Sequence, residues 1–255
     1  MASSIGMKPG DELAGKVALV TGGARNIGRA IARSLAAGGA SVMVNAKTSR
    51  AEAQKTVEMI GAKAAVHIAD VTKPEEVQAL VDATVKRFGR LDFLINNAAV
   101  RYETPFSSMK FEEWRQVLAI VLDGAFLCAR AALPHMVSAG GGTIVNIGGQ
   151  TGHKGAAERA HVITAKAGLA GMTKALAMDL APHKITVNCV VPGTIDSQRG
   201  LPGVPDRPAH RLTVPPIGRR GEPEEIAAMV RMLCGPDARY MTGQSIHLNG
   251  GGFMP

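Results

Sequence analysis

A glycine-containing turn at residues 21–28 carries the clearest chemical signal in the chain. An apolar run leads directly into the sequence TGGARNIG, and a helical pattern follows it. Phosphates bind at such turns because the first amides of a helix lack intrahelical partners and face its positive end. Gly22 permits a tight turn, Gly28 permits close packing of helix and strand, and Asn26 tolerates the left-handed backbone where a third glycine is expected. By itself the turn also fits an ordinary strand-to-helix connection. The predicted phosphate-binding residues are Gly22, Arg25, Asn26, Ile27 and Gly28.

The end of the second apolar run indicates which dinucleotide would bind. An Asp or Glu at this position would hold the ribose 2′-hydroxyl of NAD(H). The chain instead has Asn45, Ala46 and Lys47, with no acid. Lys47 and Arg25 can both pair with a 2′-phosphate, a charge-assisted contact with no equivalent in NAD(H). We therefore expect NADP(H), with NAD(H) as the weaker alternative, and include Asn45 and Lys47 in the site.

Apolar runs of strand length alternate with helical patterns along the chain, which is typical of repeated βαβ units. The runs are continuous rather than alternating, as expected for strands covered by helices on both faces. The predicted fold is an α/β, doubly wound, parallel seven-stranded sheet of the Rossmann type. Expected strands cover residues 16–21, 41–45, 65–69, 91–96, 142–147, 185–191 and 245–248, and expected helices cover 27–37, 50–60, 74–88, 111–136, 161–181 and 223–234.

The chain predicts one domain over residues 16–255, preceded by a polar extension at 1–15. Its length of 255 residues and hydrophobic content of 46% are sufficient for one large core. Residues 194–221 contain five prolines and no clear periodicity. Loops of this length in a compact domain are often functional, so we expect a mobile loop there.

Composition argues against several classes of partner and location. The net charge is +8, but the basic residues are scattered and only one Trp and two Tyr are present for base stacking, which argues against nucleic acid. Apolar stretches such as residues 185–192 are too short to cross a membrane, and no signal segment begins the chain. Three widely separated cysteines fit buried, reduced thiols. We expect a cytoplasmic protein without membrane contact.

Five ordered motifs make the chain resemble the classical short-chain dehydrogenase/reductase family, and most closely its β-ketoacyl-acyl-carrier-protein reductase type. Besides the turn, they are Asp70-Val71, Asn96-Asn97-Ala98-Ala99, Pro192-Gly193-Thr194-Ile195, and Thr242-Gly243-Gln244 before Asn249-Gly250-Gly251. The resemblance implies that Asp70 faces the adenine amino group and Asn96 the adenosine ribose, while Ile195 and Ser197 meet the nicotinamide carboxamide. The other cofactor residues it implies are Val71, Ala98, Lys166, Pro192 and Gly193.

The resemblance fails at the reaction centre. The family uses a Tyr acid/base, a Lys four residues later, an upstream Ser and an Asn on the preceding long helix. Lys166 matches the Lys, but the other three positions fall at Val162, Gly149 and Val121. General acid catalysis is worth roughly 100 to 10,000-fold in rate, so the missing donor matters.

Substitute donors near Lys166 are Tyr102, His153, Arg159 and His161. On an ideal helix that already extends back to residue 159, Arg159 lies about 20° from Lys166, whereas His161 points about 140° away and suits packing or a subunit contact better. His153, in a glycine-flanked loop, could enter a cleft, although a lone loop histidine is more often solvated. No metal-ligand spacing and no Ser/His/Asp arrangement is supported, so we expect no metal.

These observations leave three functional hypotheses. The favoured one is an NADP(H)-dependent oxidoreductase acting on a small carbonyl-like or related substrate through an atypical proton donor. The second is an NADP(H)-binding protein without redox turnover, a pseudoenzyme or sensor, and the third is a lyase or hydrolase using the same pocket. Retention of Lys166 and residues 192–197 favours the first. By resemblance, and from alanine-rich helix faces, we expect a homotetramer or dimer.

Overall fold

The computed structural model describes residues 10–197 and 214–255 of the chain. Residues 1–9, within the expected polar extension, and 198–213, within the expected mobile loop, lie outside the described part. The described part of the extension, residues 10–15, contributes one apolar side chain to the core. Leu13 is 1% exposed and packs in the core, and its amide donates to the Gly38 carbonyl at 2.8 Å.

A seven-stranded, entirely parallel sheet forms the centre of the protein, which confirms the predicted fold. Its spatial order is β3-β2-β1-β4-β5-β6-β7, so the chain reverses direction between β1 and β4. Cofactors bind in open parallel sheets at such a reversal, beyond the carboxyl ends of the strands. The strands are β1 (Val17–Val20), β2 (Ser41–Ala46), β3 (Ala64–Ile68), β4 (Phe93–Asn96), β5 (Gly142–Ile147), β6 (Ile185–Pro192) and β7 (Ser245–Leu248).

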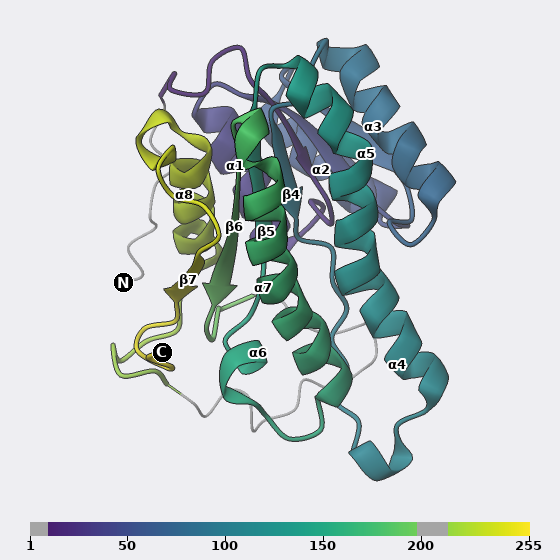
Figure 1. Ribbon diagram of the computed structural model, residues 1–255, viewed down its shortest axis with the longest axis vertical. Coiled ribbons are helices and arrows are strands. Elements are labelled where there is room, and N and C mark those ends of the chain that lie inside the picture. Colours follow the sequence, from purple (N-terminus) through teal and green to yellow (C-terminus); the bar gives the residue numbers. More distant parts are fainter. Residues whose placement is uncertain (1–9, 198–213) are drawn as a thin grey trace.

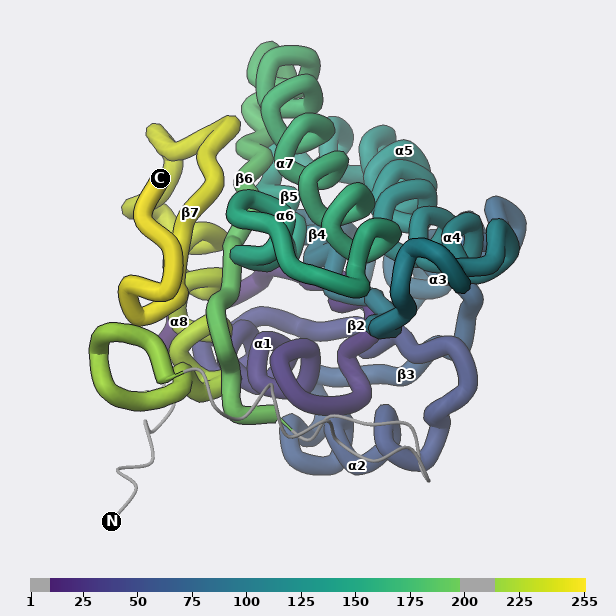
Figure 2. The backbone as a smooth tube through the Cα atoms, turned by 90° about the horizontal axis from the view of Figure 1, so that it is seen from below, coloured from purple at the N-terminus to yellow at the C-terminus, as the bar shows by residue number. Residues whose placement is uncertain are grey.

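Helices cover both faces of the sheet (Figures 1 and 2). α1, α2 and α8 lie on one side, where Ile31 of α1 and Ile226 of α8 share a buried cluster with β1 and β2. α3, α5 and α7 lie on the other side, around a second buried cluster. The bounds are α1 (Asn26–Ala37), α2 (Arg50–Ile60), α3 (Pro74–Phe88), α4 (Phe111–Leu118), α5 (Gly124–Ser138), α6 (Thr151–Lys154), α7 (Ala160–Leu180) and α8 (Pro223–Cys234).

The structure differs from the predicted elements mainly around the reaction centre. The helix expected at 111–136 is divided into α4 and α5 by a π-helical turn, Ala119–Asp123, where the Gly124 amide donates to the Ala119 carbonyl. Hydrophobic periodicity cannot distinguish such a turn from α-helix, and π turns often occur at functional sites. Residues 151–154 form the short helix α6, which has no apolar stripe to predict it. Both departures lie beside the strands that carry the site.

The described helices include one stretch, Phe111–Ser138, that is long and apolar enough to cross a membrane by length and composition alone. The expectation that apolar stretches are too short to cross a membrane rested on strand-length runs such as residues 185–192 and did not include this stretch. Within the stretch, Cys128 and Met136 of α5 are buried in the core shared with α3 and the sheet. Cys128, Cys189 and Cys234 are all buried and unpaired, as expected.

Candidate active site

The turn after β1 has the backbone geometry expected of a phosphate cradle. Gly22 has φ of 61° and Asn26 φ of 49°, so Asn26 takes the left-handed conformation that its type suggested. A Cβ on Gly28 would lie 2.2 Å from the Gly22 carbonyl oxygen, so only glycine fits between turn and helix. Arg25 caps α1 without a side-chain hydrogen bond, and Ile27 packs on the core. The N-cap side chain thus leaves the first amides of α1 available to bind a ligand.

Two polar side chains missed by the sequence analysis hold this turn in place. The Thr21 hydroxyl, 2% exposed, donates to the Ile95 carbonyl at 3.2 Å and accepts the amides of Asn97 and Ala98 at 3.0 and 3.1 Å. The Asn97 side-chain amide donates to the carbonyls of Thr21 and Gly22, each at 3.0 Å. These bonds tie the end of β4 to the turn after β1. The doubled asparagine was the available signal, but its partners lie about 75 residues away.

The end of β2 contains a polar network that modifies the predicted role of two residues. Asn45 is buried, and its side-chain amide donates to the Ala69 carbonyl at 3.0 Å. This bond joins β2 to the end of β3, so Asn45 acts in positioning. Lys47 forms an ion pair with Asp70 at 2.7 Å, while Arg25 is exposed. Both side chains are exposed, but Lys47 already has a carboxylate partner.

The surroundings of Asp70 favour its ionised form. Burial acts to raise the pKa of Asp70, but hydrogen bonds from Lys47 and Thr72 outweigh it and hold the pKa below its usual value. The Thr72 amide and hydroxyl both reach one Asp70 oxygen, at 3.0 and 2.9 Å. The carboxylate thus remains an acceptor at the edge of the site, as the predicted adenine contact requires.

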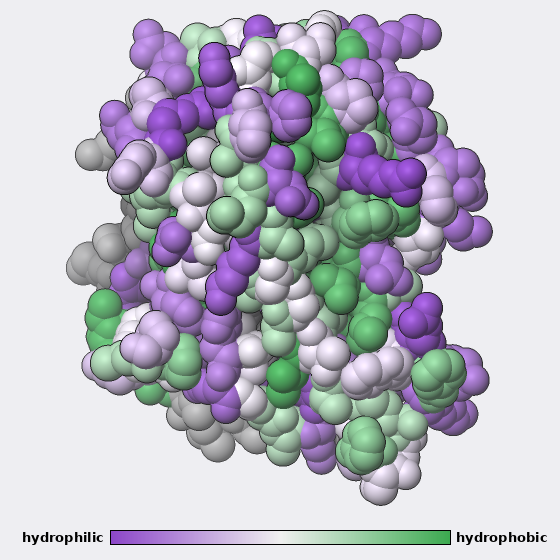
Figure 3. Space-filling view, viewed as in Figure 1, coloured by the Kyte–Doolittle hydropathy of each residue, from purple (hydrophilic) through white to green (hydrophobic). Residues whose placement is uncertain are grey.

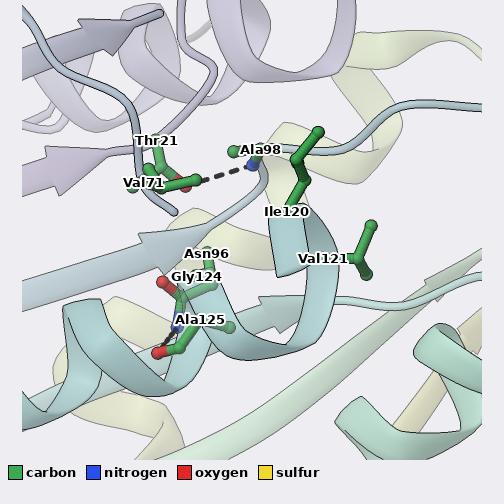
Figure 4. A pocket seen from close by; sticks show the side chains of 8 residues that line it. All are labelled: Thr21, Val71, Asn96, Ala98, Ile120, Val121, Gly124 and Ala125. Carbon is green, nitrogen blue, oxygen red and sulfur yellow. Dashed lines mark hydrogen bonds between the residues drawn. The ribbon is translucent and has the colours of Figure 1, made fainter. Parts of the chain in front are cut away.

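Asn96 lies deeper than a ribose contact would suggest. Its side-chain amide donates to the Asn146 oxygen at 2.9 Å, and it is 5% exposed. It lines a small pocket together with Thr21, Val71 and Ala98 from the strand ends and with residues of the π turn and the start of α5 (Figure 4). Because Asn96 is buried at the end of β4, its hydrogen bond to Asn146 of β5 favours a positioning role over direct contact with the cofactor.

The predicted nicotinamide side is formed by the end of β6 and the residues after it. A Cβ on Gly193 would lie 2.5 Å from Cα of Asn249, so the backbone passes very close to the segment after β7. The Pro192 carbonyl accepts the Gln150 amide at 3.0 Å, and Ile195 pairs with Gly221 and is 4% exposed. Ser197 is partly buried and is the last described residue before the gap.

Lys166 lies on α7 with its amine turned toward the end of β5. Its Nζ donates to the Ile147 carbonyl at 2.5 Å. Burial lowers the pKa of Lys166 to about 8, with the neighbouring Cys189 acting in the opposite sense. An amine that titrates near neutral pH can lend or accept a proton, which an ordinary surface lysine cannot do.

The three substituted positions differ in the space they offer. A Cβ on Gly149 would meet nothing within 4 Å. Val121 and Val162 are 2% and 7% exposed and share one buried apolar cluster with Val117 and Leu169. In Figure 4 the Val121 side chain points away from Asn96. The corner beside Lys166 is thus open at Gly149 and filled by hydrocarbon at the other two positions.

Of the substitute donors, Tyr102 packs against the cluster that contains Val121 and Val162. Its loop is tied to the start of α7 because Glu103 pairs with Arg159, and the Thr104 amide donates to the Glu158 carbonyl at 2.8 Å. Arg159 is the N-cap of α7, one residue before the helix begins, so the ideal-helix angle to Lys166 does not apply to it. Its charge serves the ion pair with Glu103.

The two histidine candidates point elsewhere. His161 is fully buried, and its Nε2 lies 2.9 Å from Glu113 of α4, so it packs α7 against α4. His153 of α6 stacks edge-on with His247 of β7, with ring centroids 4.7 Å apart, and lies near Phe253. Within the described ranges, no group of three or more His, Cys, Asp or Glu side chains lies together as metal ligands do.

Comparison with known proteins agrees with this architecture. A family model described as enoyl-(acyl carrier protein) reductase matches residues 22–252. The 3-oxoacyl-[acyl-carrier-protein] reductase of Vibrio cholerae is 39% identical over 242 residues, covering 95% of this chain and 99% of that protein. The Escherichia coli reductase of the same name is 38% identical over 240 residues, covering 94% and 98%. The chain belongs to the short-chain dehydrogenase/reductase family of oxidoreductases, and within it is similar to the 3-oxoacyl-[acyl-carrier-protein] reductase type.

Proposed function

We propose that the protein is an NADP(H)-dependent oxidoreductase that acts on a small carbonyl-like or related substrate without the family's tyrosine. The observation that carries the proposal is that one protein has both a glycine turn with the backbone conformation of a phosphate cradle and a buried Lys166 beside the end of β5. Burial lowers the pKa of Lys166 to about 8. A module that only held adenine would not need Lys166 in that position. Function is assigned from these residues rather than from the fold.

The phosphate turn fits a dinucleotide. Its cradle is kept free of side chains at Gly22, where a Cβ would lie 3.0 Å from Cα of Ala98. Arg25 and Lys47 would hold the 2′-phosphate, and Asp70 would accept a hydrogen bond from the adenine amino group. When bound, the reduced nicotinamide would supply hydride, and Lys166, beside the end of β5, would be the amine available to hold that half of the cofactor.

Cofactor preference can be measured by calorimetric titration with NADPH and NADH. We expect NADPH to bind at least roughly tenfold more tightly, a difference of about 1.4 kcal/mol. Because Lys47 already pairs with Asp70, Arg25→Ala should reduce the preference more than Lys47→Ala, and the double variant should remove it. Equal affinities in the wild type, or an unchanged preference in the double variant, would contradict the assignment to NADP(H).

Tyr102 is the donor that we propose for the missing phenol. It is the candidate that packs against the cluster filling the family's Tyr and Asn positions, and two contacts hold its loop against α7. Tyr102→Phe should lower turnover by roughly 100-fold or more while leaving NADPH affinity unchanged, because only the proton is lost. His153→Ala, which alters a ring stack near the carboxyl terminus, is the matched control and should retain most activity.

Turnover itself is tested by following NADPH absorbance with purified protein across ketones, imines, quinones and activated alkenes. Oxidation dependent on one of these classes, and lost in Lys166→Ala, supports the proposal. Tight NADPH binding without turnover on any of them would favour the alternative of a cofactor-binding pseudoenzyme or sensor. That alternative has its own support, because Val121 and Val162 leave the corner without a hydroxyl or amide. Turnover without any NADPH consumption would point to lyase or hydrolase chemistry.

We also propose that the protein is a cytoplasmic homotetramer. The outer face of α5 and α7 exposes Phe126, Val137 and Met178, by 47%, 40% and 79%. Pale and green surface follows these helices in Figure 3, with hydrophilic surface on both sides of it. Such a patch suits a contact between subunits. Light scattering at micromolar concentration should give the mass of four chains, and a monomer mass would contradict the proposal.

A further inference from the structure

A second pocket lies at the amino ends of the strands, at the opposite edge of the sheet from the phosphate turn. Lys16 precedes β1, Asp92 precedes β4, Gly142 begins β5 and Lys184 precedes β6, and all four line the pocket. Because these strands are parallel and neighbouring, residues at their starts meet at one edge. The pocket is open, has a volume of about 240 Å³, and also includes Arg239. It takes no part in the site described above.

The charges around this pocket are unbalanced. Asp92 is its only lining carboxylate, and both of its oxygens are already occupied. One accepts from Lys16 at 3.0 Å and from Arg90 at 2.6 Å, and the other accepts from Arg90 at 2.7 Å and from the Val17 amide at 3.0 Å. Across the described ranges, Lys184 and Arg239 have no carboxylate partner. A local excess of positive charge therefore faces the pocket.

Lys184 is held at the rim by a backbone conformation that favours glycine. Its φ is 58°, in the left-handed region. The Gly142 amide donates to the Lys184 carbonyl at 3.2 Å, and a Cβ on Gly141 would lie 2.5 Å from that carbonyl oxygen. The surrounding glycines thus fix the position. Strained residues of this kind cluster where a side chain has a role, and lysine here adds a cation that glycine would not.

We propose that this pocket binds a small multivalent anion of the size of a di- or triphosphate. Lys184 and Arg239 would contact it directly, and the Arg239 guanidinium can hold two of its oxygens at once. Lys16 would add charge at the floor, where Asp92 fixes its amine. The volume of about 240 Å³ is below the roughly 300–1,000 Å³ typical of sites for larger ligands, which favours a small anion.

Calorimetric titration with inorganic pyrophosphate tests the proposal, with NADPH saturating so that the phosphate turn is filled. The key variant is Lys184→Asn with Arg239→Gln, because Asn keeps the left-handed backbone while both charges are removed. Lys110→Gln with Arg115→Gln removes two exposed cations at and within α4, which follows the carboxyl end of β4 at the opposite end of the sheet (Figure 1), and is the matched control. The double variant should bind at least roughly tenfold more weakly, and the control should stay within about twofold of the wild type.

Three results would overturn the proposal: no saturable binding to the wild type at millimolar pyrophosphate, an equal loss in the control pair, or equally tight binding of sulfate at the same ionic strength. The last two would show that the net positive charge alone attracts the anion. A thermal melt of each variant verifies folding. The readout is the difference caused by Lys184 and Arg239, so it is independent of whether the protein reduces any substrate.

Discussion

The two halves of the candidate site are built in different ways. The phosphate turn is held by glycines without space for a Cβ and by hydrogen bonds from Thr21 and Asn97. The corner beside Lys166 is filled by the apolar side chains of Val121 and Val162 and is open at Gly149. Rigid polar geometry is present where a cofactor would bind, whereas hydrocarbon or open space occupies the three positions at which the family carries its Tyr, Ser and Asn. This difference is the basis for our proposal of a changed reaction on the family's cofactor frame.

The largest expected effect is in the cofactor half. Gly28→Ala would place a methyl group 2.2 Å from the Gly22 carbonyl oxygen and force the turn open. NADPH affinity should fall by roughly 100-fold, about 2.7 kcal/mol, in a fluorescence titration. Gly171→Ala is the matched control, since a Cβ there meets nothing within 4 Å on the exposed face of α7. It should leave NADPH affinity unchanged, and its melting temperature shows whether the subunit contact proposed for this face of α7 accepts the added methyl group. Wild-type affinity in Gly28→Ala would contradict the cradle geometry.

Thr21→Val should have the next largest effect. The change keeps the shape but leaves the amides of Asn97 and Ala98 without their acceptor in a buried place. The free energy of unfolding in urea should fall by roughly 2 kcal/mol, and NADPH affinity should fall with it. Thr143→Val removes one buried hydroxyl contact, with Thr186 at 3.1 Å, at the other end of the sheet. That control should lose some stability but no affinity, and a parallel loss of affinity would show that the two ends are coupled.

A smaller effect concerns the pH dependence of the reaction half. Burial lowers the pKa of Lys166 from about 10.5, its value in an unfolded chain, to about 8. The unfolded chain therefore binds more protons between pH 8 and about 10.5, and this residue makes stability rise with pH across that window. Lys166→Met should reduce the slope of unfolding free energy against pH there. An amine-labelling midpoint near pH 8 for Lys166 checks the same value directly, and a midpoint near 10 would contradict it.

The sequence predicted the fold and the backbone conformation of the glycine turn well, because both depend on local patterns. Asn26 could be assigned its backbone conformation from residue type alone, and the seven apolar runs gave the sheet. The roles of Thr21, Asn97 and Lys47 depend on partners brought together by the sheet, since Lys47 pairs with Asp70 and Thr21 with residues after β4. A single sequence contains no signal for such pairs.

The reaction half was less predictable for a different reason. Motif spacing identified Lys166 and the three substituted positions, but it gave no direction to the side chains that might replace the lost donor. His161 turned toward Glu113 and His153 toward His247, contacts that are set by packing between helices and strands. The π turn at residues 119–123, which carries Val121, has the same hydrophobic pattern as the helix around it.

The most direct test of the central claim restores the family's groups at the emptied corner. Val121→Asn, Gly149→Ser and Val162→Tyr together would place a phenol one helical turn before Lys166. Gly149 has room for the serine, whereas tyrosine at 162 must displace packed neighbours at roughly 1–3 kcal/mol, so melting temperature and NADPH affinity are measured alongside rates.

The matched control carries Val162→Phe in place of Val162→Tyr, which adds the same bulk without the hydroxyl. We expect ketone reduction by NADPH to rise in the tyrosine triple variant, and to be lost again both in the phenylalanine control and on adding Lys166→Ala. A folded, NADPH-binding triple variant that reduces ketones no faster than the wild type would contradict the account of an intact cofactor half joined to an emptied donor site.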